Sequence, residues 1–283
     1  MLNKNVETFL GCDATFDDAR CVLFGAPFDS TASYRPGARF GCRAIRAESY
    51  GIETYSPYLD RDLTDIAVFD AGDLELCIGD AAVALSQIEA FTVEILVAQK
   101  RPVLLGGEHL VTLGALRALI QRHPELHIIH FDAHADLRDD YLGAKLSHAT
   151  VMRRAWDLLG DGRIYQFGIR SGDRSEFAWG VGHVHTQRFN FDGLSDMAGA
   201  LGGTPVYFTL DLDVLDSSVF PGTGTPEAGG VSFDQLLSAA RTLSGLNIVG
   251  FDMVELAPEY DRSGVSTALA CKLLRELLLI FNQ

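Results

Sequence analysis

The sequence predicts an α/β fold, a three-layer α/β/α sandwich around a mainly parallel sheet of about eight strands. Short apolar runs alternate with amphipathic stretches along nearly the whole chain, which is typical of βαβ units with helices on both faces of a sheet. The apolar runs are continuous, as expected of strands buried on both faces. Glycine, with 28 of 283 residues, supplies the tight strand-to-helix turns that such a fold needs.

The individual elements are predicted from apolar runs bounded by turn residues and from apolar residues at helical spacing. The expected strands cover 20–25, 65–70, 102–106, 126–131, 163–169, 182–186, 205–210 and 247–252. The expected helices cover 41–50, 80–100, 110–122, 147–159, 173–180, 191–201, 232–244 and 263–281. Neither a Pro/Ser-rich linker nor a 20–50-residue repeat interrupts the alternation, so residues 1–283 are expected to form a single domain.

The charge balance favours small cations as partners. With 23 Lys and Arg against 38 Asp and Glu, the formal net charge is −15. Binding to nucleic acid needs clustered Lys and Arg, so no nucleic-acid partner is expected. A negative field attracts metal ions and basic small molecules. Acidic composition also serves solubility alone, so the charge by itself does not identify a ligand.

The cysteines and the hydropathy pattern predict a cytoplasmic protein. The five cysteines are odd in number and no two have CxxC spacing, which is not the pattern of a disulfide framework or a zinc ribbon. A reducing compartment suits them best. We see no signal peptide at the N-terminus, and no stretch approaches the ~20 apolar residues of a membrane span, so no membrane partner is expected.

Polar side chains follow several predicted strands at the edge where ligands bind in parallel sheets. Asp132, His134 and Asp136 follow the apolar LHIIHF run at positions i, i+2 and i+4, so they point to one face if the backbone is extended. Ala133 and Ala135 between them are small, which allows close packing behind. Three such groups converging would repel one another or be badly desolvated without a cation. The alternative is a polar loop with chance spacing.

Two further strands end in the same kind of residue. Asp211 and Asp213 come directly after PVYFTL and are expected to share one face, although either could instead cap a helix. His109 follows the paired glycines Gly106 and Gly107, which let the turn bring it inward, although a lone histidine is commonly structural.

Together these clusters contain four aspartates and two histidines at the ends of three predicted strands. Mixed carboxylate and imidazole ligands suit Mn²⁺, and the lack of cysteine ligands argues against structural zinc. Six ligands are more than one ion needs. Two ions bridged by carboxylates and a hydroxide, ~3.5–4 Å apart, are the natural arrangement.

At this point the motifs resemble the ureohydrolase (arginase–agmatinase) family. The matching segments are GGEH at 106–109, FDAHAD at 131–136, LDLDVLD at 210–216 with PGTGTPEAGG at 221–230, and GFDMVELAPEYD at 250–261. The segment 25–46, GAPFDSTASYRPGARFGCRAIR, is most similar to the agmatinase branch of the family. The resemblance covers about residues 20–275 in the right order. It implies an arginase-like fold, hydrolysis of a guanidino compound, and a homo-oligomer, a trimer or hexamer.

The resemblance also assigns the site. It implies two Mn²⁺ per chain, with Asp132 and Asp211 as bridging ligands. The two sites are completed by two pairs of ligands, His109 with Asp136 and His134 with Asp213.

Three more residues match the family's catalytic pattern. Glu255 is similar to the carboxylate that pairs with the substrate guanidinium, and His148 to a proton-shuttling histidine. Thr225 is expected to touch the guanidinium, and Asp136 to pass a proton to the leaving amine. Without the resemblance, Glu255 would be read as an exposed glutamate and His148 as a surface histidine in the first turn of a helix.

Other polar residues are given roles from their positions in the sequence alone. His130 shares the alternating face of Asp132 and is expected either to support it or to be structural. Asp70 and Asp73 follow a predicted strand and are expected to shape the mouth of the pocket.

Agmatine is the favoured substrate, with putrescine and urea as products and polyamine biosynthesis as the role. Arginases carry an Asn-Ser-x-Asn segment after the DAHAD-like motif to hold the substrate carboxylate. Here that region offers Asp139 and Asp140, which suit a substrate ammonium, although Arg138 precedes them. The alternatives are an amidinohydrolase acting on guanidinobutyrate or arginine, a one-zinc hydrolase of the same fold, and a non-catalytic binding protein.

Overall fold

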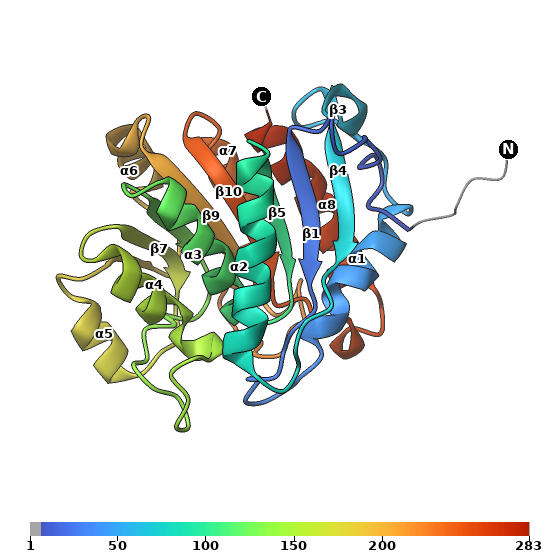
Figure 1. The fold of residues 1–283 in the computed structure, drawn as a ribbon. Coiled ribbons are helices and arrows are strands. Elements are labelled where there is room, and N and C mark those ends of the chain that lie inside the picture. Colours follow the sequence, from blue (N-terminus) through green and yellow to red (C-terminus); the bar gives the residue numbers. More distant parts are fainter. Residues whose placement is uncertain (1–6, 283) are drawn as a thin grey trace, which may run out of the picture.

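The computed structural model describes residues 7–282, in which eight strands form one central sheet between two layers of helices (Figure 1). The strand order is β4-β1-β5-β10-β9-β6-β7-β8, and every neighbouring pair is parallel. The strands of this sheet are β1 (Cys21–Ala26), β4 (Val68–Asp73), β5 (Arg101–Gly106), β6 (His127–Phe131), β7 (Ile164–Ile169), β8 (His185–Arg188), β9 (Pro205–Asp211) and β10 (Asn247–Val254).

The helices lie where amphipathic segments were expected. They are α1 (Gly41–Ser49), α2 (Ala81–Val97), α3 (Thr112–Arg122), α4 (Val151–Leu159), α5 (Arg174–Gly180), α6 (Leu194–Leu201), α7 (Phe233–Thr242) and α8 (Val265–Phe281). One hydrophobic core lies on the sheet face covered by α2, α3 and α4, and a second on the face covered by α1, α7 and α8 (Figure 1). The predicted α/β/α architecture is therefore confirmed, with all eight strands of the sheet and all eight helices.

The sequence did not predict a short antiparallel hairpin, β2 (Tyr55–Ser56) with β3 (Arg61–Asp62). Its strands have two residues each, too few to show a periodicity. The hairpin lies against α8, where Ser56 donates a hydrogen bond to Glu276 (Oγ to Oε2, 2.6 Å). In α8, 13 of 17 residues are buried. A helix that is apolar on nearly every side needs such a cover.

Several element boundaries also differ from the prediction, for example β8, which was expected at 182–186 and lies at His185–Arg188. β4 begins at Val68 because Leu63–Asp65 form a 3₁₀ turn. The helix expected from 147 begins with a 3₁₀ turn, His148–Thr150, before α4.

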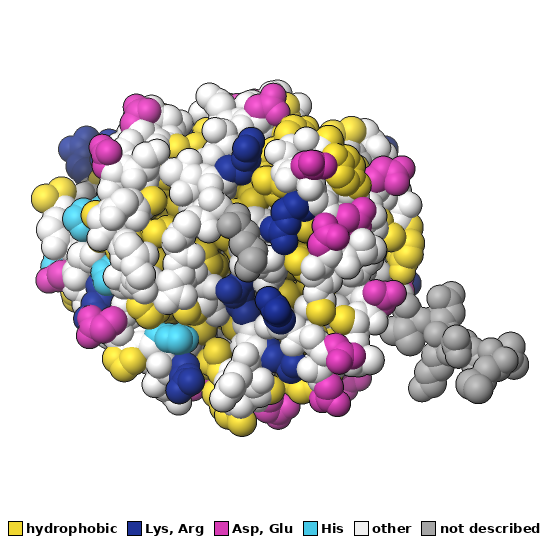
Figure 2. All heavy atoms as spheres, turned by 90° about the horizontal axis from the view of Figure 1, so that it is seen from above, with side chains coloured by type: hydrophobic (Ala, Val, Ile, Leu, Met, Phe, Trp, Pro, Cys, Tyr) yellow, Lys and Arg dark blue, Asp and Glu magenta, His cyan; other side chains and the backbone are white. Residues whose placement is uncertain are grey.

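The two ends of the sheet differ in charge. At the amino ends, Arg20, Arg61 and Arg101 line a cavity, and dark blue Lys and Arg side chains gather across the middle of that face (Figure 2). At the carboxyl ends, the four central strands β5, β10, β9 and β6 are adjacent. Parallel strands all end at one edge, so the polar segments that follow these four strands meet there. Among residues 7–282, no helix combines the length and apolar character needed to cross a membrane.

Candidate metal centre

His109 reaches the site through a turn that only glycine permits. A Cβ on Gly107 would lie 1.9 Å from the carbonyl oxygen of Phe28, and a Cβ on Gly106 would lie 2.5 Å from Val254. The chain can therefore pass directly between β1 and β10. The backbone N–H of His109 then donates to Glu255 Oε1 at 2.7 Å, which ties the end of β5 to the end of β10.

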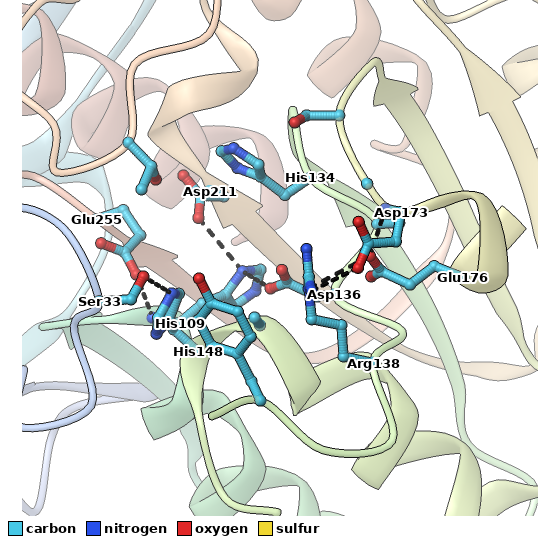
Figure 3. A pocket seen from close by; sticks show the side chains of 16 residues that line it. Ser33, His109, His134, Asp136, Arg138, His148, Asp173, Glu176, Asp211 and Glu255 are labelled. Carbon is cyan, nitrogen blue, oxygen red and sulfur yellow. Dashed lines mark hydrogen bonds and ion pairs between the residues drawn. The ribbon is translucent and has the colours of Figure 1, made fainter. Parts of the chain in front are cut away.

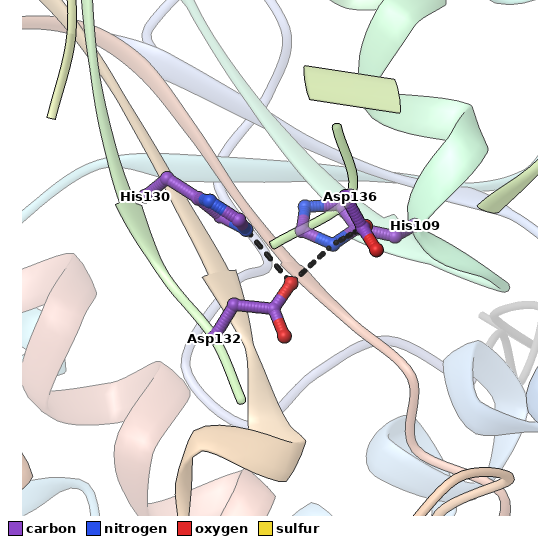
Figure 4. A group of neighbouring side chains, drawn as sticks. All are labelled: His109, His130, Asp132 and Asp136. Carbon is purple, nitrogen blue, oxygen red and sulfur yellow. Dashed lines mark hydrogen bonds and ion pairs between the residues drawn. The ribbon is translucent and has the colours of Figure 1, made fainter. Parts of the chain in front are cut away.

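The first cluster of the site contains His109, His130, Asp132 and Asp136, all buried (Figure 4). The Nδ1 atom of His109 lies 3.1 Å from Asp132 Oδ2, 3.3 Å from Asp136 Oδ2 and 3.3 Å from Asp211 Oδ2. Despite these neighbours, the geometry gives this buried nitrogen no hydrogen-bond partner among the described residues. Three carboxylates and one imidazole nitrogen thus face a single point.

The hydrogen bonds of His109 indicate which nitrogen faces that point as a ligand. Nε2 of His109 lies 2.9 Å from Thr209 Oγ1, and the Thr209 hydroxyl itself donates to Asp252 Oδ1 at 2.6 Å. The hydroxyl proton is used on Asp252, so Thr209 accepts from Nε2–H. In the neutral imidazole, Nδ1 then carries a lone pair. A lone pair turned towards three carboxylate oxygens is stable only with a proton or a metal ion between them.

The second cluster contains Asp132, His134 and Asp213. Nδ1 of His134 lies 2.9 Å from Asp213 Oδ2 and 3.5 Å from Asp132 Oδ1. Asp132 therefore turns one carboxylate oxygen to each cluster. Asp211 joins the first cluster through Oδ2, while its Oδ1 accepts from the backbone N–H of Asp213 at 2.8 Å. The structure thus brings together all six side chains predicted as metal ligands.

The way in which these side chains converge was predicted wrongly in one respect. Strand β6 ends at Phe131, an isolated parallel bridge to Ser171 follows at His134, and Asp136 has a left-handed backbone with φ 53°. Glu255, directly after β10, is also left-handed with φ 68°. Such conformations cost of order 1–3 kcal/mol for non-glycine residues and cluster at functional sites. Both turns bring a carboxylate into the site.

The alternative reading of Asp211 as a cap is also correct. Asp213 lies in a 3₁₀ turn, Leu212–Val214, and Asp211 accepts its N–H. Capping and cluster membership are compatible because the two functions use different oxygens of Asp211.

His130 supports the carboxylate of Asp132. Its Nε2 lies 2.7 Å from Asp132 Oδ2, and its Nδ1 lies 3.0 Å from the Gln166 amide nitrogen. Gln166 donates to Nδ1, so Nε2 carries the proton and donates to Asp132. Burial lowers the pKa of His130, which keeps it neutral. It orients Asp132 by a hydrogen bond.

The carboxylates of the site carry more negative charge than the protein itself neutralises. Burial, with the charge of Asp132, raises the pKa of Asp136 to about 7. Burial and the neighbouring Asp213 raise the pKa of Asp211 well above its usual range. Burial and Glu108 do the same for Glu255. Raised carboxyl pKa values mean that this end of the sheet stabilises added positive charge.

A cavity of about 300 Å³ opens onto these side chains (Figure 3). His148 lines it beside Ser33, whose Oγ lies 3.3 Å from His148 Nε2. Burial lowers the pKa of His148 to about 4, so the ring is neutral at pH 7. Thr225 also lines the cavity, with its hydroxyl 3.4 Å from Asp213 Oδ2. The predicted residues His148, Glu255 and Thr225 therefore share one cavity with four of the metal-ligand candidates, His109, His134, Asp136 and Asp211.

The outer part of the cavity holds Arg138, already named from the sequence, and two residues that sequence reasoning missed, Asp173 and Glu176. Arg138 Nη1 lies 2.6 Å from Asp173 Oδ2, and its Nε lies 3.4 Å from Glu176 Oε2. All three line the cavity (Figure 3). Asp173 and Glu176 form the capping box of α5, so in the sequence they look like an ordinary helix start. They also lie far from the DAHAD motif in the sequence, so nothing in the sequence connected them with the site.

Two expectations about acidic residues near the cavity are wrong. Asp139 points to Arg154 (2.7 Å) with its carboxylate largely exposed, and the lining residues include neither Asp139 nor Asp140. Asp70 and Asp73 do not line the cavity either, because β4 is the edge strand of the sheet. Both of these carboxylates pair with Arg46 instead.

This fold and this cluster are those of a known class of hydrolase. The sequence pattern of the arginase family matches residues 19–280. The chain therefore belongs to the arginase family, whose enzymes are ureohydrolases.

Within this family the chain is similar to proteins named agmatinase. An agmatinase of Bacillus cereus is 45% identical over 96% of this chain and 96% of its own length. A solved structure from Clostridium difficile, provisionally named an agmatinase, is 47% identical and superposes with a TM-score of 0.93 over 95% of this chain and 99% of its own. A guanidinobutyrase of Pseudomonas aeruginosa is 36% identical over 94% of this chain and 88% of its own length.

Proposed function

We propose that the protein is a binuclear manganese hydrolase that cleaves agmatine to putrescine and urea. The observation that carries this proposal is the buried Nδ1 of His109, which has no hydrogen-bond partner among residues 7–282 and faces three carboxylate oxygens at 3.1–3.3 Å. A cation is the group that satisfies such a set.

The charge of the proposed ligands favours the binding of two divalent ions. The six proposed ligands bring four carboxylates and two imidazoles, and two divalent cations neutralise the four carboxylates. Carboxylate oxygen with imidazole nitrogen is a donor set that suits Mn²⁺. His109 and Asp136 would hold one ion and His134 and Asp213 the other, with Asp132 and Asp211 shared. When bound, the ions would lower the pKa of a shared water so that hydroxide is available at neutral pH.

Glu255 would orient the substrate. Its Oε1 accepts the backbone N–H of His109 at 2.7 Å, which fixes the carboxylate within the cavity. Burial and Glu108 raise its pKa, so a cationic guanidinium restores the charged form by pairing with it. A planar guanidinium paired with a carboxylate has a defined plane, and this orients the carbon for attack. Thr225 would contact the same group from the side of Asp213.

Asp136 and His148 would move the protons. The leaving amine must gain a proton before it departs, because an amide ion is too poor a leaving group. Asp136, whose pKa is raised to about 7 by burial and Asp132, is suited to accept a proton and pass it on. His148 is neutral at pH 7 and lines the same cavity. It would exchange protons between the cavity and solvent.

The outer part of the cavity bears on the choice of substrate. Arg138, Asp173 and Glu176 together carry one negative charge in excess, which favours the primary ammonium of agmatine. The guanidinium of Arg138 also lines the cavity and is the observation that favours a second candidate, 4-guanidinobutyrate, whose carboxylate it would hold. Arginine is the least favoured of the three, because its carboxylate and ammonium need separate partners.

The direct test is urea release by the Mn²⁺-loaded protein from agmatine, 4-guanidinobutyrate and arginine under one set of conditions. We expect kcat/KM to be highest for agmatine by at least about tenfold, the ratio that 1.4 kcal/mol of selective binding produces. Faster turnover of 4-guanidinobutyrate would replace agmatine by the second candidate. No urea from any of the three would refute the proposed reaction.

Two further expectations stay predictions. A trimer or hexamer follows from the resemblance and is measured by light scattering of the purified protein. A cytoplasmic location is supported by five cysteines that are free thiols in the structure.

A further inference from the structure

Arg170 donates its side-chain hydrogen bonds to backbone carbonyls. It directly follows β7. The acceptors are the carbonyl oxygens of Gly168 (3.4 Å), Asp213 (2.7 Å), Val214 (3.2 Å), Leu215 (3.3 Å), Glu227 (2.8 Å) and Ala228 (3.2 Å). An arginine so placed acts as a tie between chain segments rather than as half of an ion pair.

The segments that Arg170 joins are those that carry one half of the site. Residues 213–215 include Asp213, and residues 227–228 close the loop that carries Thr225. The backbone N–H of Arg170 donates to the carbonyl of Ala133 at 2.8 Å. Ala133 stands between Asp132 and His134 in the sequence. One residue therefore connects the three segments from which the second cluster and Thr225 are built.

Only arginine has the donors for this arrangement. Its planar guanidinium presents five N–H groups in a fixed fork, whereas a lysine ammonium presents three from one atom. Gly230 leaves the space that the fork needs, because a Cβ there would lie 2.7 Å from Arg170 Nη2 and 2.5 Å from the backbone nitrogen of Asp216. A lysine in place of Arg170 could hold one of the two carbonyl segments but not both.

The two halves of the site differ in how their ligands are otherwise held. His109 has two short contacts of its own, at 2.9 Å to Thr209 and 2.7 Å to Glu255. Outside the ligand candidates, the carboxylate of Asp213 has longer contacts, at 3.2 Å from the N–H of Ala133 and 3.4 Å from Thr225 Oγ1. The short contacts of Asp213 are to other ligand candidates, at 2.9 Å to His134 Nδ1 and, from its backbone N–H, at 2.8 Å to Asp211 Oδ1. The position of Asp213 therefore depends on its backbone, which Arg170 holds.

We propose that Arg170 is a positioning residue for the ion held by His134 and Asp213. The proposal rests on the dinuclear centre of the proposed function, but not on the identity of the substrate. Removing the guanidinium weakens the binding of that ion by about 10- to 100-fold, the usual effect of losing a group that orients a metal ligand. The ion on the His109 side keeps its affinity.

The test is Mn²⁺ titration of metal-stripped protein, with binding measured by calorimetry and by electron paramagnetic resonance. Arg170→Met removes the donors, and Arg170→Lys keeps the charge but not the fork. Arg61→Met is the matched control, because Arg61 also donates to backbone carbonyls, those of Leu279 and Asn282, at the opposite end of the sheet. His134→Ala provides the reference spectrum of a protein that lacks the same ion.

In Arg170→Met we expect one binding step unchanged and the other weakened, with a single-ion spectrum that matches His134→Ala. Arg170→Lys keeps a long aliphatic side chain and the positive charge, so we expect it to fold. The same Mn²⁺-binding step is weakened less than in Arg170→Met. Arg61→Met lowers the melting temperature but keeps both steps. Two unchanged steps in both Arg170 variants, or the same loss in Arg61→Met, would overturn the proposal. If the wild-type protein binds two ions yet releases no urea from agmatine, the proposed substrate fails while this proposal stands.

Discussion

Carboxylates are buried at two places on the same sheet, and the protein itself pairs them with an arginine at only one of these places. On the edge strand β4, Arg46 makes a bidentate pair with Asp70 at 2.8 and 2.9 Å and also pairs with Asp73. The N–H groups of Phe9 and Gly72 complete the hydrogen bonds of Asp70. On the central strands, four aspartates face two histidines, and His109 Nδ1 has no hydrogen-bond partner in the part of the chain that the structure describes.

The difference shows what separates a structural cluster from a functional one. Around Asp70, donors and positive charge are complete, so nothing further needs to bind. Around Asp132 the negative charge exceeds what the protein provides, and burial makes that excess costly without cations. Both groups consist of carboxylates that follow or belong to apolar strands. The partners, rather than the acidic residues themselves, decide the function.

The largest expected effect is that of Asp132→Asn. The variant loses the shared ligand, so Mn²⁺ content and urea release fall together, with kcat/KM reduced about a thousandfold or more, because metal assistance is worth several kcal/mol. Asp70→Asn is the matched control on β4, and its folded fraction keeps metal and activity. Full Mn²⁺ content in Asp132→Asn would contradict the assignment of a bridging ligand.

The opposite result is expected for Arg46→Met. Without the guanidinium, Asp70 is left as a buried carboxylate without its cation, and the free energy of unfolding falls by about 3–5 kcal/mol. Chemical denaturation measures this loss, and Mn²⁺ titration of the folded protein should show two unchanged affinities. A metal-binding defect as large as the stability defect would mean that the two clusters are not independent.

Glu255→Gln separates binding of the metal from binding of the substrate. The glutamine oxygen can still accept the N–H of His109, so both ions stay bound. The guanidinium loses its charged partner, and kcat/KM for agmatine falls about 100-fold, as expected when a reacting group is misplaced. Metal analysis and steady-state kinetics on one preparation test this. An unchanged kcat/KM would remove Glu255 from the substrate site.

The smallest expected effect is on the pH dependence of Mn²⁺ binding. Burial opposes charging of His109 and His134, but the surrounding carboxylates outweigh it and raise the pKa of both well above 6.5. In the metal-free protein these charged pairs stabilise the fold below pH 6.5, and that stability is lost as pH rises through the raised pKa values. Mn²⁺ needs the neutral rings, so its affinity rises with pH, by about tenfold per unit for each proton displaced.

Calorimetry of Mn²⁺ binding in buffers of different ionisation enthalpy measures the protons released. We expect release at pH 7 and less release at higher pH. Binding without proton release at pH 7 would show that the histidines are neutral before the metal arrives.

Much of the fold and of the ligand set could be predicted from the sequence, for physical reasons. Strands buried on both faces leave continuous apolar runs, and parallel strands all end at one edge of a sheet, so Asp132, His134 and Asp211 could be placed at that edge in advance. Asp70 was misplaced because apolar runs do not reveal the order of strands in the sheet, and β4 is at its edge.

Other parts of the site had no local signal. The left-handed turns at Asp136 and Glu255 occur in residues that do not favour them, so the surrounding structure imposes them. Asp173 and Glu176 form the capping box of α5 as well as lining the cavity, so the sequence shows only their capping role. Five of the six carbonyls held by Arg170 come from segments more than forty residues away in the chain, and contacts to backbone leave no pattern in the sequence.

The measurement that tests the central claim most directly is anomalous diffraction at the manganese edge from crystals grown with Mn²⁺. We expect two peaks per chain, ~3.5–4 Å apart, with Asp132 between them, His109 at one and His134 at the other. A single peak, or two peaks away from these side chains, would contradict this expectation.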